Sequence, residues 1–188
     1  MQRKERLLDQ LRGFAAADAA EEEHRREMLV LLESAGDAFS RDHFVPGHFT
    51  ASCYVVDAEG RSLLHHHKRL DRWLQMGGHV ESEEHPELAA LREGREESGL
   101  LDLRQASDGI FDLDIHAIPA AKGEPDHAHF DIRYLAFTES PETAVADDAE
   151  SNGLAWVTLD RAAELMPGPE SARVLRKIER LWRERSLV

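Results

Sequence analysis

The chain has 188 residues, 41% of them hydrophobic, and its 37 acidic and 23 basic residues give a formal net charge of −14. This composition predicts one folded domain with or without a helical extension, and the negative charge argues against nucleic-acid polymers as partners, because their phosphates would be repelled. The sequence has no long apolar run, no signal-peptide core and no second cysteine beside Cys53, so we expect a cytoplasmic protein with no membrane partner.

Two amphipathic helices are predicted at the N-terminus. Residues 3–17 place several leucines on one helical face. Asp18 is a suitable N-cap for a second helix with its own apolar stripe. We therefore expect residues 1–45 to form an N-terminal helical extension, followed by the main domain at residues 46–188.

Strands and helices alternate through the rest of the chain. Apolar or alternating runs bounded by turn residues predict strands at residues 49–56, 61–67, 110–118, 130–137 and 154–159. A short helix is predicted at residues 160–166, and a longer amphipathic helix begins at Glu170. This combination predicts a layered α/β architecture.

The most unusual segment is GGHVESEEHPELAALREGREESGL, residues 77–100. Pro86 suits the first turn of a helix, and Gly99 suits its end. Three carboxylates three or four residues apart share one side of this helix, namely Glu93, Glu96 and Glu97. Such like charges destabilise a bare helix by about a few tenths of a kcal/mol per pair, whereas Mg²⁺ or Mn²⁺ bound among them would reverse the sign. A solvated acidic helix is the alternative.

The same segment follows a longer pattern. The spacing G-x5-E-x7-R-E-U-x-E-E-x-G-U, in which U is an aliphatic residue, is filled by Gly78, Glu84, Arg92, Glu93, Glu96, Glu97, Gly99 and Leu100. This pattern resembles the signature of the Nudix hydrolase family, and only Gly94, which stands at an aliphatic position, departs from it. The resemblance implies a Nudix-type α/β/α sandwich with a mixed β-sheet, preceded here by the N-terminal helices.

The resemblance also implies a reaction and the residues that carry it. Members of this family hydrolyse a diphosphate linkage in a nucleoside diphosphate joined to another moiety, with Mg²⁺ or Mn²⁺ as cofactor. A small-molecule diphosphate is therefore the expected substrate. The implied metal ligands are Glu93, Glu96 and Glu97 and the carbonyl oxygen of Gly77 or Gly78. Arg92 would orient Glu93, and Glu84 would hold the turn before the helix through Arg92.

Further candidates lie outside this pattern. Glu150 precedes the predicted strand at residues 154–159, where it would bind another metal ion or act as general base, a role for which Glu93 competes. A solvated acidic loop is the alternative. The candidates for binding substrate phosphates are Lys68, Arg69, Arg72 and Arg133, for each of which a simple surface charge is the alternative. Residues 119–129 and 138–153 are expected to form loops that set specificity, and a homodimer is left open.

The histidines suggest a second metal site. His127 and His129 share a face if the chain is extended, His48 stands at the start of a predicted strand, and His79 follows the glycine pair. Together they predict a transition-metal site separate from the glutamates, with local hydrogen bonding as the alternative. The three consecutive histidines at residues 65–67 are predicted to lie mostly at the surface.

Two alternative functions are open. The stretch from His48 to His79 is similar to isopentenyl-diphosphate isomerases of the same fold superfamily, and these two histidines match their metal-binding positions. The isomerase cysteine that directly precedes the glycine-histidine pair is replaced here by Gly77, so the expected acid is absent. The other alternative is a non-catalytic Nudix domain that senses a nucleotide-linked ligand, against which the intact carboxylate set argues.

Overall fold

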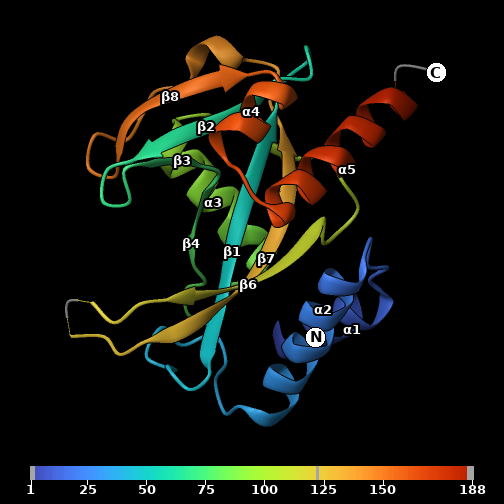
Figure 1. Cartoon of the computed structure of the whole chain (residues 1–188), viewed down its shortest axis with the longest axis vertical. Helices are drawn as coiled ribbons and strands as arrows, with labels where there is room; N and C mark the ends of the chain where they lie inside the picture. Colours follow the sequence, from blue (N-terminus) through green and yellow to red (C-terminus); the bar gives the residue numbers. More distant parts are fainter. Residues whose placement is uncertain (1–2, 122, 186–188) are drawn as a thin grey trace. The chain divides into compact units, whose positions relative to one another are not determined.

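The computed structural model describes residues 3–121 and 123–185 (Figure 1). The predicted outer limits at residues 1 and 188, and Lys122 in a predicted loop, lie outside the described residues. The elements are α1 (Arg3–Gly13), α2 (Ala19–Ser34), β1 (Gly47–Val56), β2 (Ser62–His67), β3 (Arg72–Leu74), β4 (Met76–His79), α3 (Pro86–Ser98), β5 (Arg104–Gln105), β6 (Asp112–Ile118), β7 (His127–Phe137), a 3-10 turn (Pro141–Thr143), β8 (Ser151–Val157), α4 (Leu159–Leu165) and α5 (Pro169–Arg185). The predicted α/β class and the N-terminal helices are confirmed.

The strands of the described chain belong to one hydrogen-bonded sheet of mixed connectivity. Its strand order is β3-β2-β1-β7-β5, and in addition β4 pairs with β1, β6 with β7, and β8 with β2. The chain divides into two compact units, the first from residues 1–52, 77–90 and 107–134 and the second from residues 53–76, 91–106 and 135–188. None of the described helices combines the length and the apolar character needed to cross a membrane.

The first unit contains α1, α2 and the hairpin formed by β6 and β7 (Figure 1). The hairpin is antiparallel and pairs Asp112 with Arg133 at one end and Ile118 with His127 at the other. Helix α2 begins as predicted, because the side chain of Asp18 accepts a hydrogen bond from the amide of Glu21 at 2.9 Å. The apolar faces of the two helices are buried and consist of Leu7, Leu11, Met28, Leu31 and Leu32.

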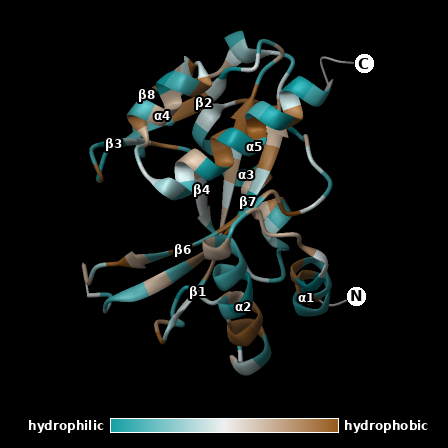
Figure 2. Ribbon diagram, turned by 45° about the vertical axis from the view of Figure 1, so that its right-hand side comes forward, coloured by the Kyte–Doolittle hydropathy of each residue, from teal (hydrophilic) through white to brown (hydrophobic). Residues whose placement is uncertain are grey.

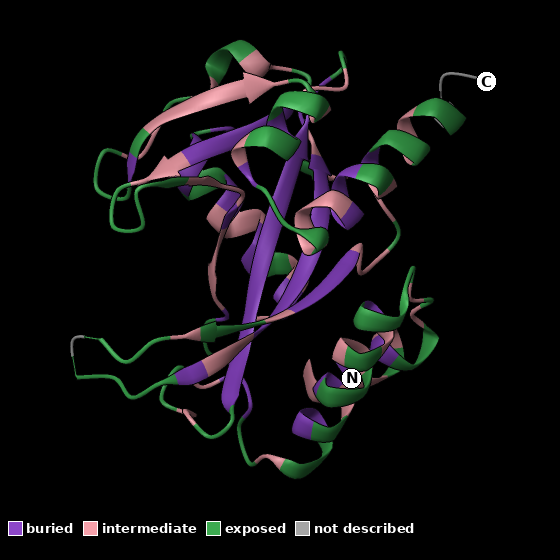
Figure 3. Ribbon diagram, in the orientation of Figure 1, coloured by how far each residue is buried: buried purple, intermediate pink, exposed green. Residues whose placement is uncertain are grey.

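The second unit is centred on β2, which pairs antiparallel with β1, β3 and β8. A strand with partners on both edges has no free edge, and the first four residues of β2 are buried (Figure 3). Helix α5 alternates hydrophobic and hydrophilic residues, as expected from its sequence (Figure 2), and buries Val174, Leu175 and Ile178. These residues belong to the apolar core of this unit.

Gly94 on α3 has a packing reason for departing from the aliphatic residue of the family pattern. A Cβ atom at this position would lie 3.0 Å from the Sγ atom of Cys53 and 3.1 Å from the Cδ1 atom of Leu103. Both neighbours are buried, so they have little room to move. The volume that an aliphatic side chain would fill is therefore already taken by Cys53 and Leu103.

Gly94→Ala is expected to lower the free energy of unfolding, by about 1 kcal/mol. Overpacking costs about 1–3 kcal/mol, and the better helix propensity of alanine offsets about 1 kcal/mol of it. Urea unfolding of a double-mutant cycle with Cys53→Ala measures this, because removal of the sulfur atom should relieve the part of the clash that Cys53 causes. A stabilising effect of Gly94→Ala in both backgrounds would contradict the packing explanation.

Candidate active site and histidine cluster

The backbone at the glycine pair lies tightly against β1 in the first unit. A Cβ atom on Gly77 would stand 2.8 Å from the carbonyl oxygen of Ala51 and 2.9 Å from the Cα atom of Ser52, so a larger residue does not fit. In the turn that follows, the side chain of Glu84 accepts a hydrogen bond from the amide of Glu81 at 3.1 Å. The close packing fixes the path of Gly77 and of Gly78, whose carbonyl remains a predicted metal ligand.

Helix α3 carries the predicted carboxylates and has the predicted limits. It begins at Pro86, and Gly99 follows its last residue with a φ of 69°, a left-handed conformation that glycine adopts without strain. In the second unit, the Nη1 atom of Arg92 lies 2.9 Å from Oε1 of Glu93 and 3.0 Å from Oε2 of Glu96. Arg92 therefore holds two of the three carboxylates on one side of the helix.

Glu93 is in an environment that disfavours its charge. Burial raises the pKa of its carboxyl group, Arg92 opposes this, and the negative charges of Glu96 and Glu150 raise it further. Several carboxylates are therefore close enough to repel one another, although one arginine is already among them. Hard oxygen donors gathered in this way fit a divalent cation such as Mg²⁺ or Mn²⁺.

Glu150 lies in a turn that is hydrogen-bonded to the end of α3. The amide of Asp147 donates to the carbonyl oxygen of Glu97 at 3.3 Å, and the amide of Glu150 donates to the carbonyl oxygen of Asp147 at 3.2 Å. The carbonyl oxygen of Glu150 in turn accepts from the amide of Lys68 at 2.9 Å. This backbone network anchors the turn of the exposed Glu150 close enough for its charge to act on Glu93, as the predicted role of Glu150 requires.

His65 is the main residue that sequence reasoning missed. The prediction that the consecutive histidines lie mostly at the surface is wrong for His65, which is only 2% exposed because it belongs to the buried part of β2. Its Nδ1 atom lies 3.9 Å from Oε2 of Glu97, which is also buried. Burial lowers the pKa of His65 to about 4, so the ring is neutral at neutral pH. Only the contact of β2 with α3, which is remote in sequence, could have shown this.

The predicted phosphate-binding residues fall into two groups, one exposed and one buried. Lys68, Arg69 and Arg72 are exposed between β2 and β3 in the unit that contains the α3 carboxylates. The Nζ atom of Lys68 donates to the carbonyl oxygen of Asp148, and the amide of Arg69 donates to Nδ1 of His67 at 3.1 Å. The guanidinium groups of Arg69 and Arg72 belong to exposed residues, so an anion in solution can reach them.

Arg133 has a different environment, which corrects its assignment as a phosphate ligand. It is buried in the first unit and contacts three carboxylates, with N···O distances of 3.1 Å to Asp131, 3.4 Å to Asp112 and 2.8 Å to Asp114. Asp131 also accepts hydrogen bonds from the hydroxyls of Thr50 and Ser52, at 3.1 and 2.8 Å. The positive charge of Arg133 is therefore already compensated, and Arg133 is excluded from the phosphate ligands proposed below.

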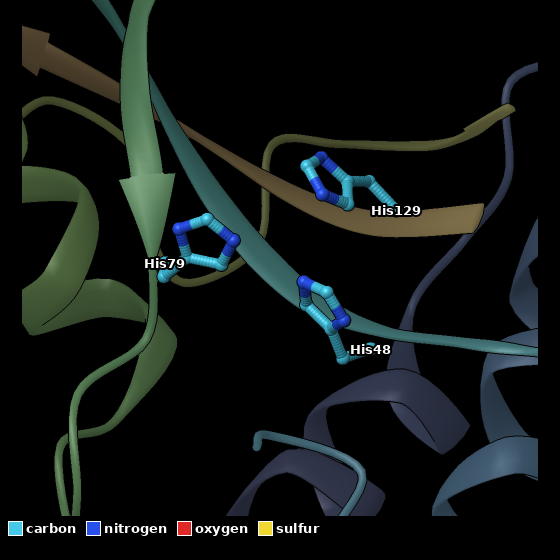
Figure 4. A group of neighbouring side chains, drawn as sticks. All are labelled: His48, His79 and His129. Atoms are coloured by element: carbon cyan, nitrogen blue, oxygen red, sulfur yellow. The ribbon is translucent and has the colours of Figure 1, made fainter. Parts of the chain in front are cut away.

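Three histidines of the first unit, His48, His79 and His129, form a cluster. His48 lies on β1, His79 at the end of β4 and His129 on β7, and one ring nitrogen of each lies within 4.8 Å of the others (Figure 4). The ring of His127 lies beside them, 5.1 Å from His48 and 5.3 Å from His129 between centroids, and its Nδ1 atom is 2.8 Å from the carbonyl oxygen of Pro125. The structure thus brings three of the four predicted ligands together, with His127 adjacent.

The rings of this cluster are neutral at neutral pH. Burial lowers the pKa of His48 to about 4 and that of His129 to about 2, and it also lowers the pKa of His79. In His48, the Nδ1 atom lies 3.3 Å from the carbonyl oxygen of His43, whereas the buried Nε2 atom has no hydrogen-bond partner within the described part of the chain. A neutral imidazole nitrogen with a free lone pair is a suitable metal ligand.

Comparisons with known proteins identify the family and the fold. The family model described as "NUDIX domain" matches residues 46–178. The curated relative "Probable DHNTP pyrophosphohydrolase" of Lactococcus lactis is 28% identical over 145 residues, which cover 76% of this chain and 84% of the relative. A NUDIX-family hydrolase from Clostridium perfringens is similar in structure, with a TM-score of 0.58 and 25% identity over 71% of this chain and 97% of that chain.

A further solved structure shows the same fold. The C. elegans Ap4A hydrolase in a binary complex has a TM-score of 0.60 and 22% identity over 72% of this chain and 98% of that chain. The match of the family model to most of the chain therefore agrees with the α3 pattern and with the sheet. The chain belongs to the NUDIX family and is a hydrolase of pyrophosphate bonds.

Proposed function

We propose that the protein is a divalent-metal-dependent hydrolase that cleaves a diphosphate linkage in a nucleoside diphosphate joined to another moiety. The observation that carries the proposal is the convergence of carboxylates on α3. Arg92 contacts Glu93 and Glu96, and the charge of Glu150 raises the pKa of Glu93. Like charges at this spacing are unfavourable alone. The arrangement is therefore best explained by a bound cation.

Mg²⁺ or Mn²⁺ is the proposed cofactor, with Glu93, Glu96 and Glu97 as ligands. When bound, the ion supplies Lewis-acid polarisation of the phosphoryl oxygens. Arg92 positions the carboxylate of Glu93. Glu97 is buried, so its side chain has little room to move. The exposed Arg69 and Arg72 are proposed to bind the remaining phosphate charge of a small-molecule substrate.

Glu150 is proposed as the general base that accepts the proton of the attacking water. Its turn is anchored to the end of α3 and to Lys68, which supports a fixed position beside the carboxylates. Glu150→Gln is expected to lower kcat by about 10²- to 10⁴-fold with little effect on metal affinity at α3. Steady-state kinetics with a metal titration measure both quantities.

Asp148→Asn is the matched control for this variant, because Asp148 lies in the same turn and its side chain is exposed. It should keep the kcat of the wild type. An unchanged kcat of Glu150→Gln across the pH range would move the proton-accepting role to Glu93. A parallel loss in both variants would instead indicate that the turn, and not the Glu150 carboxylate, is required.

The substrate panel that tests the function should contain nucleoside triphosphates, ADP-ribose, nucleotide sugars and dinucleoside polyphosphates. Ap4A and dihydroneopterin triphosphate belong in it, because proteins of similar fold are named for their hydrolysis. Each compound is incubated with Mg²⁺ or Mn²⁺ and the products are analysed by ³¹P NMR. Metal-dependent release of a cleaved phosphate product is the expected result.

Two other outcomes would overturn the proposal. A rearranged isoprenoid diphosphate would indicate an isomerase. The structure argues against this outcome, because the isomerase cysteine would stand at Gly77, where a side chain would clash with Ala51 and Ser52. Binding of a panel member without turnover would indicate a sensing domain. Isothermal titration calorimetry on the same panel separates this last outcome from simple failure to bind.

A further inference from the structure

The three histidines of the cluster lie on three different strands of the first unit. Gly47 at the start of β1 lies so close to β7 that a Cβ atom there would stand 1.8 Å from the carbonyl oxygen of Ala128. The amide of Ala128 also donates to the carbonyl oxygen of Pro46 at 2.9 Å. Because His48 and His129 directly follow Gly47 and Ala128 in sequence, this contact sets their rings side by side, with centroids 5.0 Å apart.

His48 is oriented with one nitrogen free. The Nδ1 atom faces the carbonyl oxygen of His43 at 3.3 Å, which favours the tautomer that carries the proton on Nδ1. The Nε2 atom is then an acceptor, and it is buried without a hydrogen-bond partner among the described residues, on a side chain that is 1% exposed. A buried acceptor left in this state costs about 1–3 kcal/mol, so its position calls for a ligand.

The surroundings favour a cation over an anion. Three carboxylates, Asp112, Asp114 and Asp131, share the single buried guanidinium of Arg133. Asp131 is two residues from His129 on β7, and His116, whose ring lies 5.5 Å from that of His129, contacts Asp114 at 3.0 Å. Arg41 and Glu124 act on His79 with opposite signs, whereas on the β6–β7 side the three carboxylates outnumber Arg133, and this excess of negative charge favours a divalent ion over phosphate.

We propose that His48, His79 and His129 bind a transition-metal ion, with Zn²⁺ as the representative, at a site separate from the α3 carboxylates. Their nitrogens lie within 4.8 Å of one another, and tetrahedral Zn²⁺ with Zn–N distances of about 2.0–2.1 Å brings such nitrogens to about 3.4 Å. Small rotations of the side chains achieve this contraction. Three imidazoles select zinc-like ions over Mg²⁺, which prefers oxygen ligands.

The bound ion links β1, β4 and β7, and this gives it a measurable structural effect. A ligand that binds only the folded state stabilises it in proportion to the logarithm of its free concentration over Kd. Saturating Zn²⁺ is therefore expected to raise Tm. It also fixes His79, which directly follows Gly78 on β4.

The test uses the full chain without a purification tag, stripped with chelator and titrated with Zn²⁺ by calorimetry in excess Mg²⁺. We expect one equivalent of Zn²⁺ to bind and Tm to rise. His79→Gln and His129→Gln should each weaken binding by at least about 100-fold, the upper end of the effect of losing an outer partner of a ligand. His66→Gln, on the partly exposed end of β2, is the matched control and should bind as the wild type does.

Circular dichroism and the Tm of the zinc-free variants establish that they are folded. Glu97→Gln should keep its Zn²⁺ site, which separates this proposal from that of the α3 metal. Loss of Zn²⁺ binding in Glu97→Gln with retention in His79→Gln would place the ion at the carboxylates and overturn the proposal. Absence of stoichiometric binding by the wild type, or equal binding by all histidine variants, would do the same.

Discussion

Glu97→Gln is expected to reduce turnover by at least about 100-fold while the protein remains folded, because the loss of a ligand should exceed the loss of an outer partner. The amide keeps the size of the side chain but removes the charge that binds the ion. Glu97 is buried, and its neighbour His65 is neutral, since burial lowers the pKa of His65 to about 4. A neutral amide beside this neutral imidazole introduces no new charge, so the fold should tolerate the change.

The measurement is kcat at saturating Mg²⁺ with the substrate found in the panel, together with Tm. Glu87→Gln on the first turn of α3 is the matched control, because Glu87 pairs with Arg6 at 2.6 Å and is not a proposed metal ligand. Its turnover should stay close to that of the wild type. Wild-type kcat in Glu97→Gln would show that the metal assignment is wrong.

Arg133→Met is expected to lower the free energy of unfolding by about 3–5 kcal/mol, the usual cost of leaving buried charges without their partner. Asp112, Asp114 and Asp131 would remain buried without their common cation. Urea unfolding at neutral pH measures the effect. Arg104→Met is the control, since the exposed pair of Arg104 with Glu139 should contribute about 0–1 kcal/mol.

The pH dependence of this effect has a defined sign. Burial alone would raise the pKa of Asp114, but His116 and Arg133 lower it to about 2 in the wild type. Asp114 therefore contributes stability above its unfolded pKa of about 3.9, and this contribution is lost as pH falls towards 2. In Arg133→Met the carboxylate of Asp114 loses this cation, so its part of the deficit should shrink as pH falls and the group becomes protonated. Full stability of Arg133→Met with reduced substrate affinity would instead restore the phosphate-binding role.

The α3 region and the strand positions could be predicted because their signals are local. Pro86, Gly99 and the spacing of the glutamates depend on residues within a few helical turns, and the structure has the same helix limits. The proximity of His129 to His127 also followed, because a His-x-His pair on an extended segment must share a face. Gly47, which allows β1 to approach β7, gave no sequence signal of its partner.

The burial of His65 and the three partners of Arg133 could not be predicted, because both depend on strand pairing between distant segments. Alternation shows that neighbouring residues of a strand point to opposite faces, but it does not show which face is covered. The face of β2 that carries His65 lies against Glu97 of α3, and Arg133 reaches Asp112 and Asp114 through the β6–β7 register. Gly94 is a similar case, since its neighbours Cys53 and Leu103 are remote in sequence.

The most direct test of the central claim is a titration that measures Mn²⁺ binding to the α3 carboxylates. The readout is the decrease in the EPR signal of free Mn²⁺. The titration compares the wild type, Glu97→Gln and His79→Gln, with turnover measured on the same samples. We predict that the wild type and His79→Gln bind Mn²⁺ and that turnover follows its occupancy, whereas Glu97→Gln loses both. Wild-type binding and turnover in Glu97→Gln, with loss of both in His79→Gln, would contradict the account.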